Sequence, residues 1–173
     1  MNIVQFSKFQ YALLNCFGYL SLLMGTIYYN KYLKDRETRT LIRYAIYLSI
    51  FSAFSNLLWA KRVNLDYGIS DSTFVIATDI VIGTLSLAYT QLPTMVLFAK
   101  ITPSHIEATC FAFLTGTLNF CNGVVATYTG SLVNDFFVGV TASDLSNFTT
   151  LAYISLLTSV FPLAFLGLIP LKE

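Results

Sequence analysis

The strongest constraint on this chain is that five long stretches without any charged residue separate its clusters of charge. These stretches are residues 9–30, 44–60, 80–99, 108–134 and 145–171. A helix needs roughly twenty apolar residues to cross about 30 Å of hydrocarbon, and each stretch reaches that length once its apolar flanks are included. None alternates as a membrane β-strand would. The sequence therefore predicts an all-α membrane protein with five transmembrane helices.

The composition supports a membrane location and limits the kinds of partner. The chain is 55% hydrophobic and only 11% charged, whereas soluble domains carry about a quarter charged residues. Its net charge of +1 gives no field that would attract a nucleic acid, so the expected surroundings are a lipid bilayer. Cys16, Cys110 and Cys121 lie in apolar stretches without metal-type spacing, and we expect them to be buried apolar residues.

The short linkers predict a single transmembrane helical domain over residues 1–173. We expect its spans at about residues 9–31, 41–60, 73–99, 107–130 and 147–170. Alternating loops place three basic residues on one side and seven on the other; the seven are Lys31, Lys34, Arg36, Arg39, Arg43, Lys100 and Lys172. Basic loops stay in the cytoplasm, which predicts a cytoplasmic C-terminus and an external N-terminus. An odd number of spans with an external start predicts the trailing part of a longer transporter.

Polar residues in the third span point to a lined cavity. Asp79, Gly83, Ser86 and Thr90 are spaced i, i+4, i+7 and i+11, which is one face of an α-helix. A charge within a span is costly, so Asp79 is a candidate for substrate recognition or proton coupling. The alternative is that Asp79 only pairs with a polar group on another helix.

The fourth span carries a similar polar face beside three regularly spaced glycines. Thr115, Asn119 and Asn122 share one side of the helix, and Gly116, Gly123 and Gly130 repeat every seven residues. Such glycines allow a neighbouring helix to approach closely, so helix packing is the alternative to a ligand-facing role. We expect the second and fifth spans to be more peripheral. Their main polar residues are Ser49, Ser52 and Asn56 in the second span and Ser155, Thr158 and Ser159 in the fifth.

The loop before the fourth span contains two helix-start signals. Ser104 and Glu107 have capping-box spacing, or else Thr102 caps the helix and Pro103 takes its first position. Glu107 therefore has a structural explanation, against which stands a gating or proton-handling role. Pro93 lies inside the third span and is predicted to kink it.

Several of these residues together resemble a known family. The string near the third and fourth spans is similar to the folate/biopterin transporter family of the major facilitator superfamily, and its elements are Asp79, Gln91-Leu-Pro93, Ala99-Lys100, Pro103, Ile106-Glu-Ala-Thr109, Ala112 and Asn119. The segment Asp35-Arg36-Glu37-Thr38-Arg39 also resembles a loop motif of that superfamily, with Thr38 in place of glycine.

The resemblance implies a fold and a function. The chain would correspond to spans 8–12 of the facilitator fold, with its first, third and fourth helices lining the cavity. It would be the C-terminal part of a secondary transporter for folates or pterins that works by alternating access with a missing N-terminal half. The candidate substrate or proton-coupling residues are Asp79, Ser86, Thr90, Gln91, Asn119 and Asn122, and the candidate structural or gating residues are Pro93, Pro103, Glu107, Asp35, Arg36 and Arg39.

An enzyme is not expected. The chain has one histidine and neither a metal-binding motif nor a cysteine–histidine pair, so we expect no catalytic residue, cofactor or metal. The remaining alternative is a membrane scaffold that does not transport, or a degenerate transporter fragment.

Overall fold

A computed structural model describes residues 7–169, apart from Ser104, Ala142 and the side chain of Asp79. Among these residues, five helical segments are long and apolar enough to cross a membrane: Lys8–Leu33, Thr38–Ala60, Asp71–Ile101, Glu107–Val138 and Phe148–Leu168. The predicted number of membrane helices is therefore confirmed. The described residues contain no β-strand, which agrees with the predicted all-α class.

Most of the spans are built from several helical elements. The first consists of α1 (Lys8–Tyr28) and η1 (Tyr29–Leu33), and the second is α2 (Thr38–Ala60), followed by the short α3 (Val63–Asp66). The third combines α4 (Asp71–Val75), η2 (Ile76–Ile82) and α5 (Gly83–Ile101). The fourth combines α6 (Glu107–Phe120), η3 (Cys121–Val125), α7 (Ala126–Val133) and η4 (Asn134–Val138), and the fifth α8 (Phe148–Val160), α9 (Pro162–Phe165) and η5 (Leu166–Leu168).

Local side-chain bonds determine where two of these spans begin. At the start of α1, the Ser7 hydroxyl accepts a bond from the backbone N–H of Gln10, and the Gln10 side chain accepts one from that of Ser7. At the start of α4, the Ser70 hydroxyl accepts a bond from the backbone N–H of Thr73 at 3.3 Å. Each cap satisfies a backbone donor that the first helical turn leaves unpaired.

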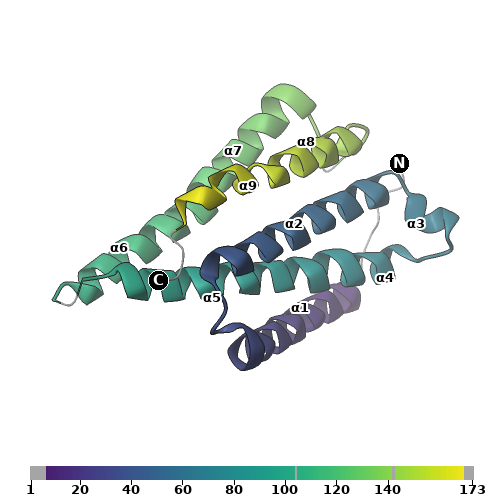
Figure 1. The fold of residues 1–173 in the computed structure, drawn as a ribbon. Helices are drawn as coiled ribbons and strands as arrows, with labels where there is room; N and C mark the ends of the chain where they lie inside the picture. Colours follow the sequence, from purple (N-terminus) through teal and green to yellow (C-terminus); the bar gives the residue numbers. More distant parts are fainter. Residues whose placement is uncertain (1–6, 104, 142, 170–173) are drawn as a thin grey trace.

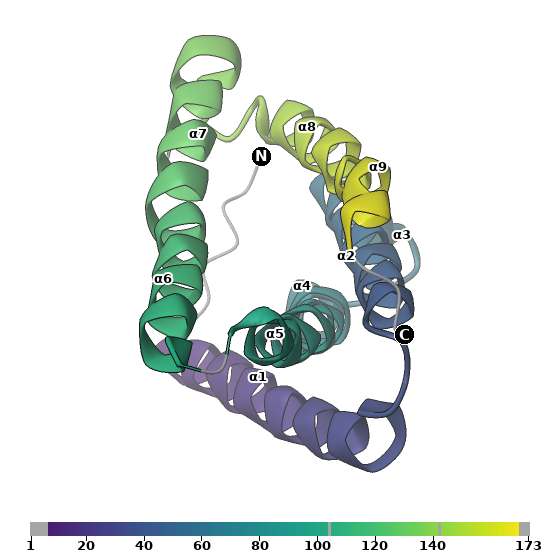
Figure 2. The same cartoon turned by 60° about the vertical axis from the view of Figure 1, so that its left-hand side comes forward.

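The second span is the centre of the bundle. Helix α2 packs against both α5 and α8, and it is the most buried of the five spans (Figure 2). Its buried positions include Ala45, Ser52, Ala53, Ser55 and Ala60, whose small side chains permit close helix contact. The expectation that this span is peripheral is therefore wrong for this chain, because serine and alanine at these positions serve packing.

Helix α5 joins the second span to the first. The buried Ser86 hydroxyl donates a hydrogen bond of 2.8 Å to the Ala45 carbonyl of α2. On another side of α5, Gly25 of α1 packs so closely that an added Cβ would lie 3.0 Å from a Leu85 methyl group. The first, second and third spans thus form one packed unit, to which α8 is added through α2 (Figure 1).

The fourth span stands apart from this unit. Figure 2 shows α6 and α7 leaning away from the other helices, and the most apolar segment of this span has no buried residue. A Cβ added at Gly116, Gly123 or Gly130 would meet no atom within 4 Å. None of the described helices therefore packs against these glycines. The interpretation that they allow close contact with another helix of this chain is wrong for the described residues.

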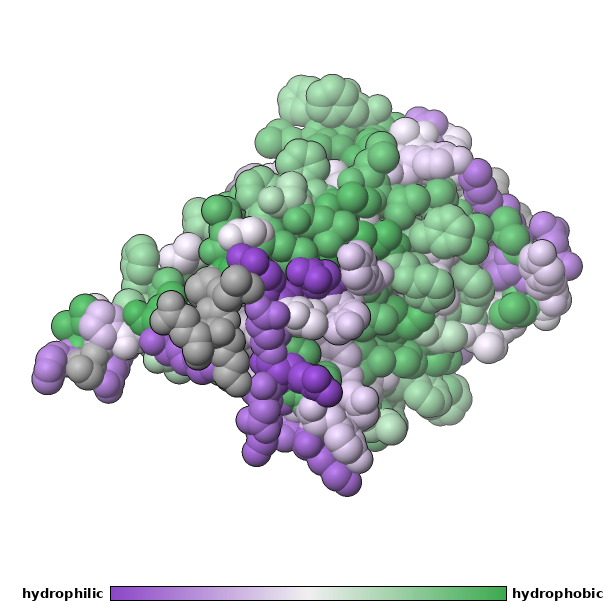
Figure 3. Space-filling view, viewed as in Figure 1, coloured by the Kyte–Doolittle hydropathy of each residue, from purple (hydrophilic) through white to green (hydrophobic). Residues whose placement is uncertain are grey.

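The surface has the pattern expected of a membrane-spanning bundle. Apolar side chains cover the middle of the molecule, and hydrophilic residues gather at its ends and around the connection between η1 and α2 (Figure 3). Cys16 and Cys121 are exposed free thiols. The expectation that these two cysteines are buried is therefore wrong for this chain, because both side chains are exposed in the bundle.

Candidate functional site

The third span does not present Asp79 and its predicted neighbours on one regular α-helical face. The backbone of Asp79 lies in the π-helical element η2, whereas Gly83, Ser86 and Thr90 follow in α5. A π-helical turn is wider than an α-helical turn, so the 3.6-residue period is interrupted between Asp79 and Gly83. π-Helical turns within α-helices are frequent at functional sites. The side chain of Asp79 lies outside the described part of the structure.

Ser86 and Thr90 line a cavity, but their hydroxyl groups already donate hydrogen bonds to backbone carbonyls. Ser86 donates to Ala45 of α2, and Thr90 donates to the Ser86 carbonyl at 2.9 Å. In this structure, Ser86 therefore chiefly supports the contact between α2 and α5. The sequence pattern does not distinguish such a packing hydroxyl from one that faces a ligand.

The other candidate substrate residues are uncovered. Gln91 at the middle of α5, Asn119 in α6 and Asn122 in η3 are all exposed. Asn122 lies in a π-helical element, as the backbone of Asp79 does. Uncovered amide side chains within a membrane span are costly in lipid, so these side chains need protein, water or a polar ligand beside them.

The start of the fourth span differs from both expectations. Helix α6 begins at Glu107, after Ile106, and no side chain of the described residues caps it. Pro103 precedes the helix, while the Thr102 hydroxyl donates to the Phe98 carbonyl at the end of α5. The Thr102–Pro103 start is thus wrong because Thr102 closes the preceding helix. The capping-box interpretation requires Glu107 to be the third residue of the helix, but Glu107 is the first, so this interpretation is also wrong. Its other residue, Ser104, lies outside the described part of the chain.

Pro93 is fully buried inside α5, which continues through it to Ile101. A proline ring removes one backbone donor from the helix, which leaves the carbonyl of Tyr89, four residues earlier, without its helical hydrogen bond. The structure thus places Pro93 in the packed part of the third span.

The segment that resembles the superfamily loop motif, residues 35–39, is hydrogen-bonded to the end of the fifth span. Asp35 and Arg36 lie in the turn before α2, and Arg39 lies in its first turn. The Arg39 guanidinium donates from Nε to the Ile169 carbonyl at 3.0 Å and from Nη2 to the Gly167 carbonyl at 2.9 Å. Arg39 therefore joins the start of the second span to the end of the fifth, which places both at the same end of the bundle.

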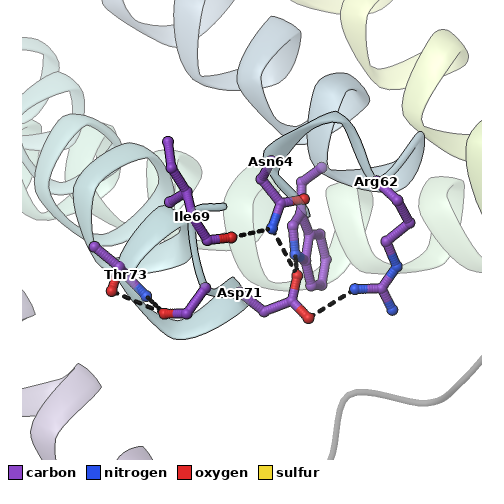
Figure 4. Close-up of polar contacts among 7 residues, drawn as sticks. Arg62, Asn64, Ile69, Asp71 and Thr73 are labelled. Carbon is purple, nitrogen blue, oxygen red and sulfur yellow. Dashed lines mark hydrogen bonds and ion pairs between the residues drawn. The ribbon is translucent and has the colours of Figure 1, made fainter. Parts of the chain in front are cut away.

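A polar cluster at the opposite end was not predicted from the sequence (Figure 4). One carboxylate oxygen of Asp71 accepts hydrogen bonds from the indole of Trp59 at 2.8 Å and from the Asn64 side chain at 3.0 Å. The other oxygen forms an ion pair of 2.8 Å with Arg62. The buried Asn64 side chain also donates to the Ile69 carbonyl, which fixes the connection between the second and third spans.

The cluster also reaches the fifth span. The ring of Trp59 meets that of Phe148 edge to face, with 5.9 Å between centroids. The sequence pattern does not link Trp59 to Asp71. Because Trp59 and Asp71 are twelve residues apart, helical periodicity within one span could not have paired them.

This fold and these polar faces define a multi-pass helical membrane protein. The chain belongs to the BT1 family, whose family model matches residues 1–173. It is 32% identical over 148 residues to a folate-biopterin transporter of Synechocystis sp., an alignment that covers 86% of this chain and 29% of the relative.

Two further relatives have similar coverage. The chain is 32% identical to the probable folate-biopterin transporter 9, chloroplastic, of Arabidopsis thaliana, over 90% of this chain and 28% of that protein. It is 24% identical to folate transporter 1 of Plasmodium falciparum, over 98% of this chain and 33% of that protein. The chain thus spans about 30% of the length of these curated relatives. No solved structure matches it.

We predict that Asp71→Asn loosens the end of the bundle at which the cluster lies. The substitution keeps the side-chain size but removes the ion pair with Arg62 and weakens the bonds from Trp59 and Asn64. Loss of such charge-assisted bonds costs about 1–3 kcal/mol, so thermal unfolding in detergent should occur at a lower temperature. Trypsin should also cleave faster after Lys61 and Arg62.

The matched control is Asp66→Asn, which changes an exposed aspartate in the same connection. It should leave both the unfolding temperature and the trypsin cleavage rate close to those of the parent chain. Equal behaviour of the two variants would show that the cluster does not hold this end together.

Proposed function

We propose that this chain is the C-terminal part of a secondary transporter that moves folates or pterins across a membrane. The observation that carries the proposal is membership of the BT1 family over the whole chain, together with relatives named as folate-biopterin or folate transporters. Transport would occur by alternating access, in which this helical unit moves against an N-terminal half. The relatives are about three times as long as the chain, which leaves room for such a half.

The uncovered fourth span supports an arrangement with a second half. Helix α6 and the adjoining element η3 bring Asn119 and Asn122 to the surface, where both side chains are exposed. Exposed amides and bare glycines are unfavourable against lipid, but they suit a water-filled path or a close protein neighbour. We therefore assign this face to the substrate path and the interface with the N-terminal half.

Within that path, we propose that Asp79, Gln91, Asn119 and Asn122 contact the substrate. A pterin ring carries several hydrogen-bond donors and acceptors, for which carboxylate and amide groups are suitable partners. Asp79 is also the group that we assign to proton coupling, because a carboxyl group within a membrane span is suited to exchange protons. Ser86 and Thr90 have secondary roles in this proposal, since their hydroxyls bond to backbone carbonyls.

We predict that Asp79→Asn lowers uptake of folate or pterin by the full-length transporter roughly tenfold or more, because it removes a charged hydrogen-bond acceptor. Any dependence of uptake on external pH should also become weaker. The measurement is uptake of labelled substrate at several pH values, with the amount of inserted protein determined in parallel. Asp135→Asn, which changes an exposed residue near the end of the fourth span, is the control and should transport normally.

Unchanged uptake and unchanged pH dependence in inserted Asp79→Asn would contradict the role of Asp79. If the parent full-length protein itself transports neither folate nor pterin, the substrate class is wrong. In that case the scaffold alternative gains support.

We further propose that the loop around Lys34 and the end of the fifth span face the cytoplasm. The Arg39 bonds place both at one end of the bundle, and that end carries most of the basic residues. Single cysteines in a background without Cys16, Cys110 and Cys121 would test this orientation. We predict that a membrane-impermeant maleimide added to intact cells labels Ser143→Cys but not Lys34→Cys. The reverse pattern of labelling would contradict the orientation.

A further inference from the structure

The packed unit contains an apolar cavity that the proposed substrate path does not require. The cavity has a volume of about 660 Å³ and lies between α2, α5 and the C-terminal elements α8, α9 and η5. Its apolar lining includes Ile42, Ile46, Phe161, Phe165, Leu166 and Ile169. In a membrane, such a space is filled by hydrocarbon or by side chains from another helix.

The hydroxyl groups along this cavity offer few donors to a polar ligand. Ser86 donates to the Ala45 carbonyl, Thr158 to the Ile154 carbonyl and Ser159 to the Leu156 carbonyl. Thr90 likewise donates to the carbonyl of Ser86. A heterocycle with many polar edges would therefore lose hydrogen bonds to water without replacing them here. An alkyl chain has no such cost.

One end of the cavity lies beside a concentration of positive charge. Arg39 bonds to the carbonyl of Ile169, and Ile169 itself lines the cavity. Residues 31–43 contain five basic side chains and two acidic ones. Figure 3 shows this hydrophilic group around the connection between η1 and α2, against the apolar surface of the bundle. Arg43 is exposed one helical turn beyond Arg39, within the second span.

We propose that this cavity binds one acyl chain of an anionic phospholipid, whose phosphate lies beside Arg39 and Arg43. Basic pockets between membrane helices are typical binding places for anionic lipid headgroups. The two parts of such a lipid match two parts of the site. The apolar lining of the cavity suits the acyl chain, and the excess of basic residues suits the phosphate. The lipid would fill the angle between α2 and the C-terminal helices and stabilise their contact. The inference requires the membrane location but not the transport activity.

Lipid retention by the purified chain tests this site. The probes are phosphatidylglycerol and phosphatidylcholine with identical acyl chains, and native mass spectrometry measures how much of each remains bound. The parent chain should retain phosphatidylglycerol in preference to phosphatidylcholine. Arg43→Gln should lower retention of phosphatidylglycerol about fivefold and leave that of phosphatidylcholine unchanged. Arg43 is exposed, so this variant does not disturb the packed helices.

A second variant tests the acyl-chain part of the site. Ser49 is exposed and lines the cavity, so Ser49→Phe places a ring in the space for the chain and should reduce retention of both lipids. The control Thr127→Phe, on the exposed face of α7, should retain lipid like the parent. Far-ultraviolet circular dichroism verifies that the variants keep their helical content.

Three results would overturn the proposal. The first is equal retention of both lipids by the parent chain, and the second is normal retention by Ser49→Phe. The third is unchanged retention of phosphatidylglycerol by Arg43→Gln. Normal lipid retention by Ser49→Phe together with a change in its oligomeric state would make the cavity a contact between copies of this chain.

Discussion

The contact between α2 and α5 is the interaction on which the rest of this bundle depends. Helices in lipid gain little from the hydrophobic effect when they associate, so close packing and interhelical hydrogen bonds supply the attraction. Here the Ser86 hydroxyl donates to the Ala45 carbonyl at a buried position. The two ends of α2 are then fixed by polar side chains: Arg39 bonds to the end of the fifth span, and Arg62 pairs with Asp71 at the start of the third.

This arrangement explains why the fourth span is the least buried of the five. Once α2 has α5 on one side and α8 on another, and α1 covers a further side of α5, the fourth span is left with contacts of α6 with α5 and of η4 with α8. Its most apolar segment has no buried residue among those described. Its exposed amides and glycines are the features that a lipid-facing helix would avoid. These features, together with relatives about three times as long, are the basis of our proposal that the fourth span faces a second half of a transporter.

The sequence predicted the five spans because charge is excluded from hydrocarbon, which is a strong constraint that needs no knowledge of packing. It did not predict which span is central, because Ser86 in a packed contact and a serine facing a ligand look alike in a helical pattern. The spacing from Asp79 to Thr90 fits a regular α-helix, so the sequence did not predict the π-helical turn of η2. The bonds from Trp59 and Arg62 to Asp71 depend on the turn between two spans, in which Arg62 has a left-handed φ of 62°.

The central claim, that this chain packs around α2 and α5 and leaves the fourth span uncovered, is tested most directly by adding the same side chain at two glycines. Gly25 lies against Leu85, whereas Gly116 has no neighbour within 4 Å of an added Cβ. Valine changes helix propensity equally at both positions, so the difference between the variants reports packing. Thermal unfolding of the purified chain should show Gly25→Val destabilised by about 1–3 kcal/mol and Gly116→Val close to the parent. An equal or larger loss of stability in Gly116→Val would contradict the claim.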